Sequence, residues 1–181
     1  MPPAAPAGAR CVFVERRRRR AGRSGGPAAD GGLGDSGAVL VVVLHLAAVA
    51  ALTGIIWVVQ LLVYPAFRTV GPTDAWPRHH ARHSARIAQV LLLPWAVQGV
   101  TLAVLLLRPP PGVPYWLVVA AAALGLGTVV HTVAVAVPLH TRLGAGWSLP
   151  VADRLVRTNW WRTALWTLGL AAAIAMALRA P

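Results

Sequence analysis

Long runs of apolar residues, separated by short polar segments, dominate the pattern along this chain. They cover residues 38–63, 87–107, 115–138 and 160–178, contain no Asp, Glu or Lys, and include a single Arg, Arg162. About 20 helical residues are needed to cross a bilayer core about 30 Å thick, and each run approaches or exceeds that length. The pattern predicts an all-α polytopic membrane protein with four transmembrane helices in an antiparallel up-down bundle.

Residues 1–36 have a different composition. They are rich in Arg, Pro, Gly and Ala, include the run Arg16 to Arg20, and have almost no periodic apolar pattern. Such a segment buries too little surface to fold, so we expect a disordered tail followed by one transmembrane domain at residues 37–181. An alternative is that translation begins near residue 37 and that the tail results from a wrongly assigned start.

Proline and glycine mark the expected ends of the helices. The first helix is predicted to end at Val63-Tyr64-Pro65 and the third at Pro138, because proline disfavours helix in the residue before it. The stiff segment Arg108–Pro114 leaves room only for a tight connection between the second and third helices. Residues 141–158 are predicted to form a turn and then a short interfacial helix.

The charge of the chain is strongly positive. All 17 basic residues are Arg, and the formal net charge is +12. Beside apolar spans, Arg residues orient helices and contact anionic lipid headgroups, so we expect membrane lipids as partners and no nucleic acid. The abundance of Arg, Ala, Gly and Pro is typical of a high-GC bacterial genome. We therefore expect a multi-pass protein of the bacterial inner (plasma) membrane.

The direction of insertion depends on the tail. The two long loops at residues 64–86 and 139–159 lie on one side of the membrane in the predicted topology, and they contain seven Arg residues. The positive-inside rule places these loops in the cytoplasm. Counting the seven Arg residues of the tail reverses this orientation.

Polar residues within or beside apolar spans are costly, so their positions indicate function. Most of them lie towards the end of the helices that carries the long loops, and His80 and His83 have the spacing that places both on one helix face. We expect a polar pocket open to that membrane face. The candidate ligand-binding residues are Gln60, His80, His83, Arg86, His131, His140, Asn159 and Arg162.

Three interpretations of this pocket are open. His80, His83, His131 and His140 could hold a metal ion or haem, since imidazole binds zinc, copper and iron. Alternatively, Arg86, Arg162 and the His group could bind an anionic headgroup or a lipophilic small molecule. In the third, these side chains only anchor helix ends at the headgroups. Cys11 is the only cysteine, and the chain contains no HExxH, no paired Glu-x-x-His and no CxxCH.

The sequence leaves enzyme status open. No carboxylate pair and no nucleophile with its base can be assembled within the spans. The alternative to a ligand-binding protein or membrane enzyme is a non-catalytic interaction or assembly subunit. In that case a helix partner would pack against the small residues of the third helix, Ala121, Gly125, Gly127 and Ala134.

Four separated segments resemble an uncharacterised family of small four-helix bacterial integral membrane proteins. They are Trp57-x-x-Gln60-x-x-x-Tyr64-Pro65, His80-x-x-His83-x-x-Arg86-Ile87, Pro138-x-His140-x-x-Leu143 and Asn159-Trp160-x-Arg162-Thr163-x-x-Trp166. The resemblance covers residues 38–178 and implies the fold and a membrane location. More distantly, the helix count and the Asn and Arg of the fourth helix are similar to anthrone-oxygenase-like membrane proteins, whose pattern lacks the His-rich second helix.

Overall fold

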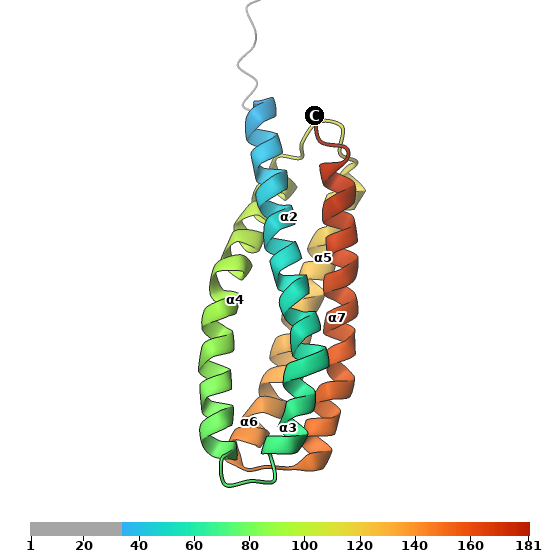
Figure 1. Ribbon diagram of the computed structural model, residues 1–181. Helices are drawn as coiled ribbons and strands as arrows, with labels where there is room; N and C mark the ends of the chain where they lie inside the picture. Colours follow the sequence, from blue (N-terminus) through green and yellow to red (C-terminus); the bar gives the residue numbers. More distant parts are fainter. Residues whose placement is uncertain (1–33) are drawn as a thin grey trace, which may run out of the picture. The chain divides into compact units, whose positions relative to one another are not determined.

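The computed structural model describes residues 34–181, which form four long helical rods and no strand (Figure 1). The tail predicted at residues 1–36 lies outside the described residues except for its last three, of which Asp35 and Ser36 already belong to the first helix. In chain order, the elements are α2 (Asp35–Val58), the π-helical turn η1 (Val59–Val63), α3 (Tyr64–Val70), α4 (Trp76–Leu107), α5 (Tyr115–His131), the π-helical turn η2 (Thr132–Ala136), α6 (Val137–Ala145) and α7 (Leu149–Ala177).

Three of the four rods are long and apolar enough to cross a membrane. They are Asp35–Val70 with 36 residues, Trp76–Leu107 with 32 and Tyr115–Ala145 with 31. The fourth rod, α7, has 29 residues but is not among them. Its first half contains Asp153, Arg154, Arg157 and Arg162, so its longest uncharged stretch is shorter than in the other rods.

Two of the predicted helix ends are wrong. The first rod continues past Pro65 to Val70, and the third continues past Pro138 to Ala145. In both rods, the proline lies two residues after the end of a π-helical turn and occupies the first turn of the next α-helical segment. A proline lacks the backbone N–H and collides with the carbonyl group one turn earlier in a regular α-helix. The wider π turn rearranges the local hydrogen bonds, which lets the helix continue.

The segment at residues 141–158 also differs from the prediction. Its first part completes α6, a short connection covers residues 146–148, and α7 then runs without interruption from Leu149. The expected interfacial helix is therefore the beginning of α7. As Figure 1 shows, this connection and the turn at residues 71–75 lie at one end of the bundle, while the C-terminus lies at the other. We call the former end the loop end.

The rods pack through their small and apolar residues. α2 contacts both α4 and α7, and α5 contacts α7. The core includes Leu52, Leu105, Val118 and Met176, all almost fully buried. Large apolar side chains also cover the outside of the bundle, most clearly Leu92, Leu93, Leu107 and Leu178. An apolar exterior around a core that contains buried polar groups is the arrangement that a lipid environment favours.

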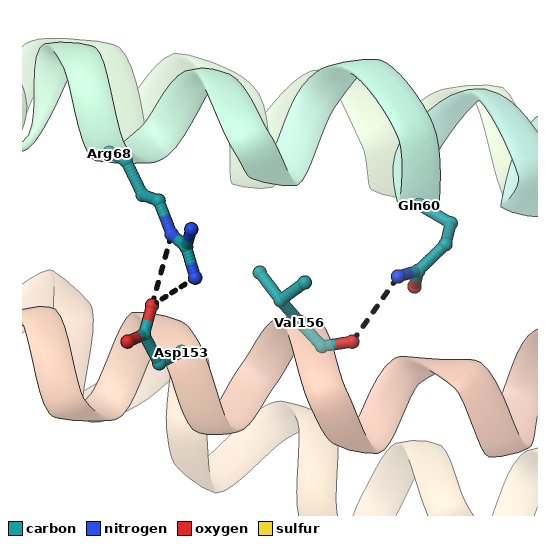
Figure 2. Close-up of polar contacts among 4 residues, drawn as sticks. All are labelled: Gln60, Arg68, Asp153 and Val156. Carbon is teal, nitrogen blue, oxygen red and sulfur yellow. Dashed lines mark hydrogen bonds and ion pairs between the residues drawn. The ribbon is translucent and has the colours of Figure 1, made fainter.

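One ion pair fastens the loop end. Arg68 on α3 donates to the carboxylate of Asp153 on α7 at 2.7 Å (Figure 2). This contact is the only ion pair within residues 34–181. Both side chains are partly exposed, so the pair contributes at most about 1 kcal/mol. The pair matters mainly because it uses Asp153, which is one of only three acidic residues in the described part of the chain.

Candidate functional site

A cavity of about 670 Å³ lies between the rods and reaches from the loop end into the apolar middle of the bundle. Along α4 its wall extends from His80 to Trp95, which corresponds to about 22 Å of helix. Its deep part is lined mainly by aliphatic and aromatic side chains, and its polar groups lie mostly towards the loop end. The polar side chains in the wall are Tyr64, His80, His83, Ser84, Thr132, His140, Thr141 and Arg162.

The cavity opens on one side of the bundle. On α4, the lining residues Ala81, Ala88 and Leu92 are exposed, and on the facing rod Val137 and Thr141 are exposed. The lining residues contributed by α2 and α7 are mostly buried. The mouth therefore lies between α4 and the η2–α6 part of the third rod, on a surface that is apolar over much of its length.

Tyr64, His140 and His80 form a chain of hydrogen bonds at the loop end of the cavity. The Tyr64 hydroxyl lies 3.1 Å from Nε2 of His140, and Nδ1 of His140 lies 3.3 Å from Nε2 of His80. The three residues come from α3, α6 and α4. Both nitrogen atoms of the His140 ring are thus engaged, one as a donor and one as an acceptor in the neutral form.

An aromatic group holds these imidazoles in place. Phe67 is 1% exposed, and its ring centroid lies 5.1 Å from that of His83 and 6.4 Å from that of His140. His83 also stacks on His140 at 5.9 Å. Trp76 packs edge-on against Phe67 at 5.1 Å and donates from its indole to the carbonyl of Leu143. Rings packed edge to face keep few alternative rotamers, so the geometry of the cluster is fixed.

Burial and mutual proximity keep these imidazoles neutral. All three lie outside the apolar runs predicted to span the bilayer. Burial lowers the pKa of His80, with a further lowering by His79. Burial, and then the neighbouring His80 and His79, lower the pKa of His83 to about 4. Burial, followed by repulsion from His80, His83 and Arg162, lowers the pKa of His140 to about 3. At pH 7 the cluster offers donors and acceptors without charge.

A second polar group, formed by Gln60, Asn159 and Arg162, connects η1 to α7. Asn159 donates from Nδ2 to Oε1 of Gln60 at 2.7 Å, and Arg162 donates from Nη1 to Oδ1 of Asn159 at 3.3 Å. Gln60 in turn donates to the backbone carbonyl of Val156 at 3.3 Å (Figure 2). Gln60 is 3% exposed and Asn159 1%. These amides are satisfied by one another, as buried amides must be.

Arg162 is the exception in this network. It is 8% exposed, lines the cavity and has no hydrogen-bond partner for its Nε atom. No carboxylate pairs with it within residues 34–181, since the only ion pair there joins Arg68 and Asp153. Of the three interpretations of the polar residues, this burial in the cavity wall favours ligand binding by Arg162 over anchoring of a helix end at the headgroups. A buried guanidinium without a counter-ion is costly unless an anion reaches it.

The other predicted site residues lie elsewhere. His131 is half-buried on α5, its Nδ1 has no partner among the described residues, and it is not part of the cavity wall, although the next residue, Thr132, is. Arg86 is exposed and lines a different groove, on the outer side of α4. The structure thus brings together His80, His83, His140 and Arg162 around the cavity, with Gln60 and Asn159 behind Arg162.

The four histidines predicted as metal ligands do not form a metal centre in this arrangement. In the part of the chain that the structure describes, no group of three or more His, Cys, Asp or Glu side chains could hold a metal ion. One reason is that both nitrogens of His140 are used in hydrogen bonds, and another is that His131 lies apart. Haem needs only one or two axial imidazoles, so haem binding stays a prediction.

Sequence reasoning missed several residues of this site. Tyr64 was not among the candidate residues, yet it is 2% exposed and hydrogen-bonded to His140. Phe67 and Trp166 are buried beside the imidazoles and Arg162, respectively, and neither stood out as a candidate. The available signal for Tyr64 was its spacing of four residues from Gln60, which places both side chains on the same side of a helix.

Comparison with known proteins adds no relative: no family model, no curated protein and no solved structure matches this chain. The resemblance to small four-helix bacterial membrane proteins, and the more distant one to anthrone-oxygenase-like proteins, therefore stay predictions.

Proposed function

We propose that this chain is a multi-pass membrane protein that binds a lipophilic molecule with one anionic group in the cavity between its rods. In this proposal all four rods cross the bilayer in antiparallel order, with the loop end in the cytoplasm of a bacterial cell. The anionic group contacts Arg162, and the apolar part of the ligand occupies the deep end of the cavity. The ligand is a small molecule or a lipid with a carboxylate or phosphate group.

The single observation that carries the proposal is the uncompensated charge of Arg162. Arg162 is 8% exposed and lines the cavity, and its guanidinium lacks both a carboxylate and a partner for Nε within residues 34–181. A protein keeps such a group where a ligand supplies the missing charge, because intramembrane ionisable residues mark ligand sites. An anion bound there also gains a charge-assisted hydrogen bond in a medium of low dielectric constant.

The rest of the wall fits an amphiphile. Leu52, Ile56, Leu91 and Trp95 line the deep part of the cavity, whereas the neutral imidazoles and the Tyr64 hydroxyl lie towards the loop end. Apolar walls with a few polar groups at one end are typical of small-molecule sites. Because the mouth opens between α4 and α6, the ligand enters sideways from the bilayer rather than from water.

Quenching of tryptophan fluorescence tests this function. Trp95 and Trp166 line the cavity, so a brominated fatty acid such as 9,10-dibromostearate quenches them when it binds to the purified full chain in detergent. The Arg162→Gln variant is expected to weaken this binding about tenfold to a hundredfold, the effect of losing one charge-assisted hydrogen bond. The matched control is Arg157→Gln, which removes the same charge from an exposed position on α7.

The neutral methyl ester of the same fatty acid separates charge recognition from simple partitioning. We expect it to bind the original chain and the Arg162→Gln variant with equal affinity. If dibromostearate binds all variants equally well, Arg162 does not recognise the ligand and the proposal is wrong.

The assembly alternative relies on the small residues of the third rod. Within the chain, a side chain at Gly125 would contact Gln98 on α4, and one at Gly127 would contact Leu165 on α7. Ala121 is also buried. These three positions therefore allow close packing inside the bundle, which leaves only the exposed Ala134 of that face free for a partner. No observation favours assembly over ligand binding.

A further inference from the structure

A second hollow lies on the outer side of α4, away from the mouth of the cavity. It is a groove of about 620 Å³ between the first part of α4 and the segment formed by η1 and α3. We call it the basic groove. Its basic side chains are Arg78, His79, Arg82, His83 and Arg86, and its apolar side chains include Val63, Val70, Ile87 and Val90. Two of these residues, His83 and Ile87, also belong to the wall of the cavity described above.

Within residues 34–181, no acidic side chain pairs with the Arg residues of the basic groove. Arg78, Arg82 and Arg86 are spaced four residues apart on one face of α4, where like charges repel one another. The described residues contain three acidic side chains, and none of them pairs with these Arg residues, since Asp153 binds Arg68 and Asp35 and Asp74 form no ion pair there. An anion seated in the groove would relieve this repulsion.

The position of the basic groove indicates where that anion comes from. Arg86 comes directly before the apolar run at residues 87–107, so the three guanidinium groups stand at the level of the lipid headgroups. Ile87 and Val90 continue the wall in the direction of the bilayer core. A free anion in water gains nothing from these apolar side chains, whereas a lipid fills both parts of the groove at once.

We propose that the basic groove is a binding site for an anionic phospholipid of the surrounding leaflet, with its phosphate group held by Arg78, Arg82 and Arg86 and its first chain segments placed against Ile87 and Val90. Arginine suits this task because its planar fork donates two hydrogen bonds to one phosphate group. The three Arg residues line only the basic groove and not the ligand cavity, so the binding of the phosphate group does not depend on the function proposed for Arg162.

Native mass spectrometry of the purified full chain tests this proposal. The probes are phosphatidylglycerol, phosphatidylcholine and inorganic phosphate, each titrated into the detergent-solubilised protein. We expect phosphatidylglycerol to bind most tightly. Replacing Arg78, Arg82 and Arg86 together by Gln is expected to weaken that binding on the order of a hundredfold, given the effect of each basic residue near an anionic lipid surface.

A matched variant removes the same charge elsewhere. Arg142, Arg154 and Arg157 are exposed residues near the same end of the bundle and line neither hollow, so their triple replacement by Gln is expected to leave phosphatidylglycerol binding within about twofold. Circular dichroism of both triple variants establishes that they are folded. In the basic-groove variant, dibromostearate quenching is expected to be unchanged, so failure of this site is distinguishable from failure of the cavity.

Two results would overturn the proposal. Equal loss of phosphatidylglycerol in the two triple variants would mean that overall charge, and not the basic groove, attracts the lipid. Displacement of phosphatidylglycerol by millimolar inorganic phosphate would mean that the groove recognises the phosphate group alone, without the lipid chains.

Discussion

The hydroxyl group of Tyr64 lies 3.1 Å from Nε2 of His140, although 76 residues separate the two along the chain. Both residues lie just after a π-helical turn and close to a proline at which the helix continues. Tyr64 directly follows η1, and His140 comes two residues after Pro138. A π-helical turn followed by a proline occurs in both rods, and these two turns bring the polar side chains together at the loop end of the cavity.

Replacing Tyr64 by Phe should destabilise the protein. The variant loses one hydrogen bond and leaves Nε2 of the half-buried His140 without a partner, which costs roughly 1–2 kcal/mol. The measurement is the free energy of unfolding in mixed micelles, followed by circular dichroism. Tyr115→Phe is the control, because Tyr115 is 53% exposed, and it should change the free energy by less than about 0.5 kcal/mol. Equal effects of the two variants would contradict a structural role for the Tyr64–His140 contact.

Acid should destabilise the bundle through its neutral imidazoles. The pKa of His83 is lowered from 6.5 to about 4, so in acid the unfolded chain binds a proton that the folded chain does not. The contribution of His83 to the free energy of unfolding is therefore fully present above pH 6.5 and is lost as the pH is lowered towards 4. Thermal unfolding measured between pH 8 and pH 4 checks this. His83→Gln should show a shallower decline than the original chain, and an unchanged pH dependence would mean that His83 is not held neutral.

Much of the fold follows from the sequence because apolar length is a strong signal. Each rod contains nearly all of one predicted run, although it extends beyond that run at the loop end, and three of the rods have the length and composition to cross a membrane. The signal is weakest where Arg162 interrupts the apolar run of α7. Helix continuation beyond Pro65 and Pro138 could not be predicted, since a π turn depends on how the backbone relaxes around proline and has no apolar period of its own.

The sequence predicts how far along its helix each candidate side chain lies, but it does not predict the direction in which that side chain points. The number of residues between a side chain and the end of an apolar run gives its height along the helix, and most candidates do lie towards the loop end. The direction of a side chain changes by about 100° from one helical residue to the next. Thr132 consequently lines the cavity whereas His131 does not, and Arg86 faces the basic groove rather than the cavity. Such rotations are set by packing between helices, which a single sequence does not reveal.

Replacing Arg162 by Met should make the ligand-free protein more stable and less responsive to ligand. The guanidinium is buried without a counter-ion, so an apolar side chain of similar length removes a desolvation cost. After removal of lipid, the free energy of unfolding should rise by about 1 kcal/mol or more, even with the bond to Asn159 lost. Added dibromostearate should stabilise the original chain but not this variant, as expected when only the former binds it.

The control for this prediction is Arg157→Met, which replaces an exposed Arg of the same helix and should leave both quantities nearly unchanged. A large loss of stability in Arg162→Met would show that Arg162 holds the bundle together through Asn159 and Gln60, and that ligand binding is not the reason for its burial.

Gly71 allows the turn at the loop end to pack against an aromatic ring, and replacing it by Ala should disturb that turn. A side chain at Gly71 would collide with the ring of Trp147, which itself packs edge-on against Trp76 at 4.8 Å. The overpacking should cost roughly 1–3 kcal/mol. Displacement of Trp147 towards water should also shift the tryptophan emission to longer wavelength. Gly146→Ala is the matched control, since open space surrounds Gly146 and its backbone is extended, so neither stability nor emission should fall. If Gly71→Ala leaves both unchanged, the contact between this turn and Trp147 does not hold the loop end together.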